Sequence, residues 1–173
     1  PADPQAERWL TKLLDRPVRL VWLDDPTRRP VDPAYGQPAD RVSFADGYPL
    51  LLTNAASLDA LNEWMLAAGD PEAPVPMTRF RPNVVVAGAR PWAEDEWLGR
   101  RLRIGAVTFR AAKPCGRCVV TTTDQETGQR GREPLRTLGR YRNINQKLVF
   151  GLNLIPDPPF GEIAPGDPVA LLP

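Results

Sequence analysis

The feature that most constrains the fold is a series of short, β-branched runs in the second half of the chain. Turn-forming residues separate these runs, and one short helical pattern interrupts them at 133–142. The expected strands are residues 83–88, 101–112, 118–124, 147–155 and 168–172. Many short strands with turns between them indicate a small barrel or a sandwich. We therefore expect a β-rich α+β protein.

The first part of the chain carries helix signals and one long loop. Asp3 can cap a helix that has Pro4 at its first position, and the helix repeats its apolar residues on one face. These apolar residues are Ala6, Trp9, Leu10, Leu13 and Leu14. Residues 18–23, "VRLVWL", predict a buried strand, and the Pro-rich residues 24–41 predict a loop of a length often used for lids or binding loops.

A second strand and a second helix are expected before residue 70. Residues 48–53, "YPLLLT", form a short apolar run. Ser57 can then cap a helix that Gly69 closes. The apolar side of this helix consists of Leu58, Leu61, Met65 and Ala68. Residues 70–77, "DPEAPVPM", predict a linker to the strand-rich part.

Composition excludes several classes of protein. The chain of 173 residues carries 22 Lys and Arg against 21 Asp and Glu, which gives no electrostatic case for nucleic-acid binding. No apolar run approaches the roughly 20 residues of a membrane span, and the N-terminus has no signal-peptide pattern. Two cysteines are too few for a disulfide-built secreted fold, so we expect a reducing, cytoplasmic location.

The two cysteines, Cys115 and Cys118, lie in "KPCGRCVVTTTD". A redox dithiol of the thioredoxin type needs a helix at its first cysteine, whereas "CVVTTTD" predicts a strand. A structural zinc ion needs four ligands, and the chain has no histidine. Two alternatives stay open on these residues alone: two small, partly buried thiols, or a single thiolate bound to a transition metal.

The surrounding motifs resemble a known family. They are "FRPN" (80–83), "AEDEW" (93–97), "IG" (104–105), "CGRCVVTTTDQETG" (115–128), "EPLRTL" (133–138) and "GDPV" (166–169), preceded by "FADGYPLLLTNAASLDALN". In order and spacing they resemble the MOSC domain, and most closely the MOSC proteins of the mitochondrial amidoxime-reducing component and its bacterial relatives. The resemblance implies a MOSC-type small β-barrel over residues 79–173, preceded by a helix–strand segment over 1–78 that includes the Pro-rich loop. The upstream N-terminal domain of full-length members has no match in this chain.

The same resemblance implies molybdenum cofactor (Mo-molybdopterin) as the bound group. Cys118 matches the cysteine that ligates molybdenum, and Cys115 becomes a neighbour. Gly116 and Arg117 would bring the backbone close to the metal.

Two other segments match cofactor-binding positions of the family. Arg81 and Asn83 match residues that hold the pterin and its phosphate, which suits an arginine. Asp46, Gly47 and Tyr48 match a loop that contacts the pterin largely through its backbone.

The implied function is the reduction of N-hydroxylated compounds such as amidoximes, hydroxylamines or N-hydroxylated bases. Electrons would come from a separate ferredoxin-, flavodoxin- or cytochrome b5-like protein, since no ferredoxin-like cysteine cluster follows the C-terminal strand. A non-catalytic molybdenum cofactor carrier or a sulfur-relay module is the alternative. The acids of "WAEDEW" would either dock a cationic redox partner or form a solvated turn, and Arg28 and Arg29 are expected to be solvated surface charges.

Overall fold

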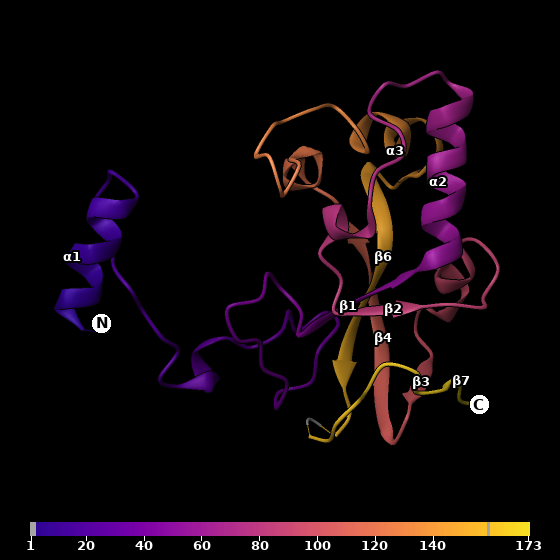
Figure 1. Cartoon of the computed structure of the whole chain (residues 1–173). Coiled ribbons are helices and arrows are strands. Elements are labelled where there is room, and N and C mark those ends of the chain that lie inside the picture. Colours follow the sequence, from indigo (N-terminus) through magenta and orange to yellow (C-terminus); the bar gives the residue numbers. More distant parts are fainter. Residues whose placement is uncertain (1–2, 159) are drawn as a thin grey trace.

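The computed structural model describes residues 3–158 and 160–173 (Figure 1). The helices are α1 (Pro4–Leu13), α2 (Ala55–Ala67) and α3 (Leu135–Tyr141), with 3-10 turns η1 (Pro26–Arg28), η2 (Met77–Phe80), η3 (Ala93–Trp97) and η4 (Val119–Thr122). The strands are β1 (Leu50–Asn54), β2 (Val84–Val86), β3 (Arg101–Ile104), β4 (Val107–Gly116), β5 (Asn143–Ile144), β6 (Lys147–Pro156) and β7 (Val169–Leu171). The expected α+β, β-rich class is confirmed.

The strands form one curled, nearly closed sheet of barrel-like shape. Its order is β2-β1-β6-β4-β3-β7, with β5 paired to β6 as a short extension. Only β1 and β2 run parallel, while the long strands β4 and β6 are antiparallel and form the spine of the sheet. β1 lies centrally between β2 and β6, so the segment before residue 79 contributes a strand to the body. A domain division at residue 79 stays a prediction.

Two apolar clusters hold the body together. One packs strand residues such as Leu52, Leu102 and Leu154 against Trp97 of η3. The other packs Leu61, Met65, Phe80, Leu138 and Phe150 beneath α2 and α3. Gly151 allows β1 to approach β6, because it has a φ of +85° and a Cβ there would lie 2.6 Å from the carbonyl oxygen of Leu52. The second cluster fixes the helices on the sheet.

The N-terminal segment differs from its prediction. Asp3 caps α1, accepting a hydrogen bond from the backbone N–H of Gln5, and this prediction is confirmed. The predicted buried strand at 18–23 is wrong, since these residues form no strand and Trp22 is 73% exposed. Figure 1 shows α1 and the following segment apart from the sheet, where no strand is available to pair with residues 18–23.

The cap of α2 also differs from its prediction. Asn54, and not Ser57, caps the helix, with its side-chain oxygen accepting from the N–H of Ala56 at 3.1 Å. Ser57 is buried within the first turn and donates to Glu94 at 2.9 Å. Gly69, with a φ of +66°, follows the helix end as predicted. The Ser57 hydroxyl is thus a hydrogen-bond partner of a buried carboxylate.

Two predicted strand boundaries change near the cysteines. Residues 101–112 divide into β3 and the start of β4, which turn back at Gly105 with a φ of +54°. The predicted strand at 118–124 is wrong, because residues 119–122 form the 3-10 turn η4. The hydroxyls of Thr121 and Thr122 donate to the carbonyls of Cys118 and Val119, and such local bonds compete with a sheet ladder. Asp124 stabilises the residues that follow, because its Oδ1 accepts from the N–H groups of Glu126 and Thr127.

Candidate functional site

A cleft of about 830 Å³ opens along one side of β4 and β6. Four separate segments line it: the loop before β1 with the start of β1, the turn between η2 and β2, the end of β4 with η4, and the β6 residues Lys147 and Asn153. All eight residues predicted for the site line this cleft, namely Asp46, Gly47, Tyr48, Arg81, Asn83, Gly116, Arg117 and Cys118. The fold therefore brings together residues that are up to 72 positions apart in the sequence.

The cysteine segment forms the floor of the cleft where β4 ends. The pairing of β4 with β6 shifts register between positions Pro114 and Gly116 of β4. Gly116 then lies opposite Val149 of β6. Irregular pairing of this kind bends a strand and redirects its side chains. Both thiols are free, with Cys118 exposed and Cys115 half-buried. The exposed Cys118 at the start of η4 is the thiol that a ligand in the cleft can reach most directly.

Arg117 connects two walls of the cleft. Its Nη1 donates to Cys115 Sγ at 2.9 Å, and its Nη2 donates to the carbonyl oxygen of Phe80 at 2.7 Å. The guanidinium also lies over the Phe80 ring, 5.7 Å from its centroid. The backbone N–H of Arg117 donates to Leu148, so it is not available to a ligand. The side chain of Arg117 therefore orders Cys115 and the turn that carries Arg81.

Arg81 and Asn83 differ in how far they are engaged by the protein. Asn83 is held in the sheet, since its Oδ1 accepts from the N–H of Leu51 at 2.8 Å and its own N–H donates to the Leu51 carbonyl at 2.9 Å. Arg81 has a left-handed backbone with a φ of +53° and is exposed. Within the described part of the chain its guanidinium has no hydrogen-bond or ion-pair partner. Of these two residues, Arg81 is thus the one whose side chain is free to bind an anion.

The loop before β1 places the half-buried Tyr48 at the cleft. Burial raises the pKa of Tyr48 to about 12, with smaller contributions from Asp32 and Tyr35. Its hydroxyl is buried and has no hydrogen-bond partner in the part of the chain that the structure describes. The carbonyl of Asp46 accepts from Arg29 Nη2 at 2.8 Å, so Arg29 fixes this loop and is not merely a solvated charge. Arg28 pairs with Asp24 at 2.9 Å on the surface.

The cleft carries an excess of positive charge. Four cations line it, Arg81, Lys113, Arg117 and Lys147, against the single carboxylate of Asp46. Sequence reasoning missed Lys113 and Lys147. Lys113 stands two positions before Cys115, and the two-residue alternation of a strand could have placed both on the same face. Its Nζ lies 4.6 Å from the ring centroid of Tyr35, which leaves the ammonium directed at aromatic faces.

The acids of "WAEDEW" match the predicted solvated turn only in part, and the predicted docking role stays a prediction. Glu94 is buried and accepts hydrogen bonds from Asn54 at 3.0 Å and Ser57 at 2.9 Å. Asp95 pairs with Arg142 at 2.8 Å, and Glu96 pairs with Arg90. Glu94 and Asp95 are therefore bonded within the body, whereas Glu96 and its partner Arg90 are exposed at the surface of the turn.

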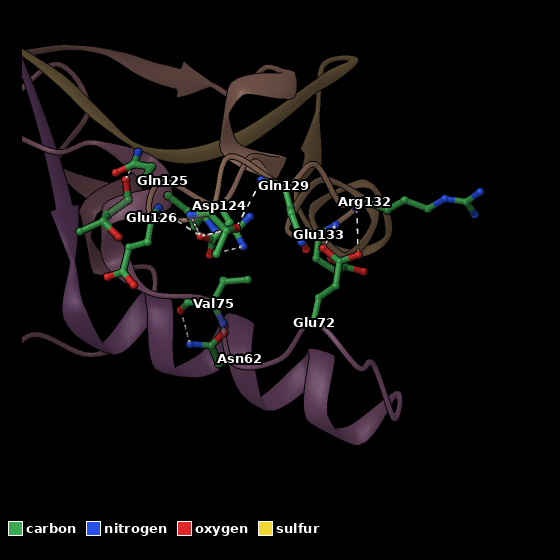
Figure 2. Close-up of polar contacts among 12 residues, drawn as sticks. Asn62, Glu72, Val75, Asp124, Gln125, Glu126, Gln129, Arg132 and Glu133 are labelled. Carbon is green, nitrogen blue, oxygen red and sulfur yellow. Dashed lines mark hydrogen bonds and ion pairs between the residues drawn. The ribbon is translucent and has the colours of Figure 1, made fainter.

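Polar contacts fix the loop that follows η4 (Figure 2). Asp124 accepts from the N–H groups of Glu126 and Thr127, at 3.1 and 2.8 Å, and its pKa is held below the ordinary range mainly by the hydrogen bond from the Thr127 backbone. Glu72 reaches across from the end of α2 and accepts from the N–H of Arg132 at 2.9 Å. Gln125 donates to the carbonyl of Thr78 at 2.7 Å. These bonds tie the loop after η4 to η2, through Thr78, and to the segment that follows α2, through Glu72.

Two negative findings apply to the described residues. In residues 3–158 and 160–173, no three His, Cys, Asp or Glu side chains are grouped closely enough to hold a metal ion on their own. In the same residues, no helix is long and apolar enough to cross a membrane.

Comparison with known proteins places the chain in a family. The family model of the MOSC domain matches residues 39–170. Mitochondrial amidoxime-reducing component 1 of Homo sapiens is 37% identical over 179 residues, which cover 95% of this chain and 50% of that protein. Molybdenum cofactor sulfurase of Oryza sativa subsp. japonica is 32% identical over 163 residues, covering 88% of this chain and 20% of that protein.

The chain is also similar to a solved structure, and it spans only part of the length of its relatives. The crystal structure of YiiM from Geobacillus stearothermophilus aligns with a TM-score of 0.47 at 16% identity, covering 73% of this chain and 55% of that one. The chain spans about half the length of the human relative and a smaller share of the rice relative. The match over residues 39–170, together with these identities, shows that the chain belongs to the MOSC domain family.

Proposed function

We propose that the chain binds molybdenum cofactor in the cleft and takes part in the reduction of N-hydroxylated compounds. The observation that carries the proposal is the convergence of four segments, distant in sequence, on one cleft that presents an exposed thiol and four cations. Relatives named for amidoxime reduction and for molybdenum cofactor sulfuration support the choice of ligand.

The donor set fits this cofactor. Molybdenum favours soft sulfur ligands, and the exposed Cys118 supplies one thiolate at the edge of the cleft. The pterin carries a phosphate, and the cation excess of the cleft matches that charge. The unpaired hydroxyl of Tyr48 is an orphaned polar atom that a ligand can satisfy. Because the described residues form no metal site of their own, a bound metal would need donors from the cofactor as well.

Each residue then has a defined task. Cys118 would hold the metal, and Arg81 and Asn83 would hold the phosphate and the pterin. Gly116 would let the backbone approach the ligand, although a Cβ there would make only an ordinary contact with the Lys147 side chain at 3.6 Å. Arg117 would hold Cys115 and the turn that carries Arg81 in fixed positions relative to each other. Asp46, Gly47 and Tyr48 would close the opposite wall, where the phenol stays protonated and can donate a hydrogen bond.

The reaction consumes two electrons and two protons: an N-hydroxyl group becomes an N–H group, and its oxygen leaves as water. The cofactor would supply the oxygen-transfer chemistry, while the protein binds and orients both reactants. A separate ferredoxin-, flavodoxin- or cytochrome b5-like protein would supply the electrons. We place this reaction in the cytoplasm and assign residues 79–173 to the barrel core and residues 1–78 to the segment that precedes it.

The two cysteines test the proposal directly. Cys118→Ser should abolish molybdenum retention after purification, because a serine oxygen is a poorer ligand for a thiophilic metal. Cys115→Ser should retain most of the metal and serves as the matched control. Molybdenum content by elemental analysis and pterin content by fluorescence measure both variants. Equal losses in the two variants would contradict a single-ligand site.

A cofactor carrier or sulfur-relay module is the second candidate. The sulfurase relatives support it, because this chain matches part of proteins named for that activity. The two candidates differ in turnover. A reductase converts an N-hydroxylated substrate repeatedly when a reductant is present, whereas a carrier binds the cofactor and releases no product.

A further inference from the structure

Charge is distributed unevenly along the chain. Residues 113–147 contain eight Lys and Arg but only three Asp and Glu, while the remaining residues contain fourteen and eighteen. The near-neutral total of +1 therefore conceals a segment of net charge +5. This segment carries both cysteines, η4 and α3, so its charge is concentrated around one part of the fold.

Four cations of this segment are exposed and free. They are Arg130, Arg132, Arg140 and Lys147, which we call the basic face. Within residues 3–158 and 160–173, none of their side chains has a carboxylate partner, whereas Arg142 is paired with Asp95. Figure 2 shows the Arg132 side chain extending away from the contacts around it, while Glu72 binds only its backbone N–H. The basic face is thus available to an external anionic surface.

The basic face adjoins the cysteine side of the cleft. The backbone of Arg130 forms an isolated antiparallel β-bridge with Thr123, the residue that directly follows η4. Arg140 lies in α3, which packs against η4, and the Lys147 side chain lies beside Gly116. Arg132 follows Gly131, whose N–H donates to the carbonyl of Thr122 in η4. Since η4 begins immediately after Cys118, all four cations are carried by segments close to the turn that starts at the proposed metal ligand.

We infer that the basic face docks the acidic surface of the electron-donor protein. This inference rests on the proposed function, because only a reductase needs such a donor. A redox partner must bring its own redox group close to the cofactor, and complementary charge next to Cys118 orients the encounter and raises its rate. Electron-transfer contacts are small and transient, so a few exposed cations suffice.

A nucleic acid fits these observations less well. Affinity for nucleic acid grows with the number of phosphates that Lys and Arg neutralise, and the basic face offers four cations. The remainder of the chain has an excess of acids and would repel a polyanion.

The experiment uses the full, cofactor-loaded chain with two probes, an acidic [2Fe–2S] ferredoxin and an acidic flavodoxin. The variant Arg130→Glu/Arg132→Glu/Arg140→Glu reverses three exposed charges outside the cleft. Arg103→Glu is the matched control, because Arg103 is equally exposed but lies in β3, at the opposite end of the sheet from α3 (Figure 1). Binding to each probe is measured at low and at high salt. The rate of N-hydroxyl reduction is measured with reduced probe and, separately, with reduced methyl viologen.

We expect the triple variant to lose at least about tenfold in probe affinity and in probe-driven rate at low salt, with the difference shrinking at high salt. The methyl viologen rate should be unchanged, and Arg103→Glu should behave as the unaltered chain. Binding of neither probe, equal losses with Arg103→Glu, or tight binding to duplex DNA instead would overturn the inference. Failure of the proposed function would look different: salt-sensitive probe binding would persist, while methyl viologen would support no reduction.

Discussion

The N-terminal arm (residues 3–28) and the sheet body (residues 50–173) carry similar apolar patterns and use them differently. Trp9 and Trp22 of the arm are 63% and 73% exposed, whereas Phe150 and Leu102 of the body are fully buried. In the body, each apolar stripe faces a second element that arrives from elsewhere in the chain. Apolar periodicity therefore predicts which element forms, while burial requires a partner that the periodicity does not specify.

The difference has an energetic consequence. A ten-residue helix is marginal in isolation, because nucleation is costly and most helical stability comes from packing. α1 has its Asp3 cap and Pro4 but no buried residue in the described chain. We therefore expect the free energy of unfolding to reside in the body and not in the arm, and the following predictions test this contrast.

The largest effect should come from the body core. Phe150 is fully buried and stacks on Phe80 with ring centroids 3.8 Å apart. Phe150→Ala should lower the free energy of unfolding by about 3–5 kcal/mol, because it removes apolar contacts and leaves a cavity. Urea denaturation followed by circular dichroism measures this loss. A change below about 1 kcal/mol would show that the second cluster does not hold the helices to the sheet.

Ser57 should come next. Its hydroxyl donates to Glu94 and accepts from the N–H of Trp92 at 2.8 Å, inside the body. Ser57→Ala leaves both buried groups without this partner and should cost about 1–3 kcal/mol. Asp59→Ala, on the exposed side of α2, provides the control and should change stability little. If Ser57→Ala is neutral in the same denaturation assay, the hydroxyl is dispensable to Glu94.

The junction between arm and body should respond to pH. Burial raises the pKa of Asp40, but the hydrogen bond from Arg110 at 2.6 Å, the backbone N–H of Gln37 and the nearby Arg41 outweigh it, so the pKa is below its ordinary value. A carboxylate with a lowered pKa stabilises the fold above its unfolded pKa of about 4 and loses that contribution as the pH falls through the folded value. Unfolding free energies measured between pH 6 and pH 3 should fall less steeply in Asp40→Asn. Parallel pH curves for the two proteins would contradict this role.

The smallest effect should come from the arm. Trp9→Ser and Trp22→Ser should each change the free energy of unfolding by less than about 0.5 kcal/mol, as is usual for exposed positions. Both tryptophans should also be quenched readily by acrylamide, unlike the buried Trp97. A destabilisation comparable to that of Ser57→Ala would mean that the arm packs against an apolar surface in solution.

Sequence reasoning succeeded where chemistry is local and failed where it depends on tertiary partners. The Asp3 cap, the Gly69 helix end and the helix near 135–141 follow from local signals and are confirmed. Residues 18–23 satisfy strand propensity but find no pairing partner. Residues 118–124 are rich in β-branched side chains, which favour a strand. The threonine hydroxyls donate to nearby carbonyls and favour a 3-10 turn instead.

The site was predictable only in part for a similar reason. The motifs identify eight positions that do line one cleft. A motif indicates which residues lie together in the fold, but it does not show which contacts each of them makes. Lys113 and Lys147 were missed, since their place in the cleft depends on the pairing of β4 with β6. The roles of Glu94 and Arg29 were also out of reach, because each depends on contacts with residues 17 to 40 positions away.

At Arg81, the left-handed backbone makes the residue best for stability different from the residue best for anion binding. A residue with a side chain costs roughly 1–2 kcal/mol more than glycine in this conformation. A library of variants at this position, sorted for thermal tolerance, should therefore enrich glycine, while sorting for anion retention should enrich arginine. The chain carries arginine at position 81, although stability alone would favour glycine. Natural sequences and sequences engineered for stability should therefore differ at this position.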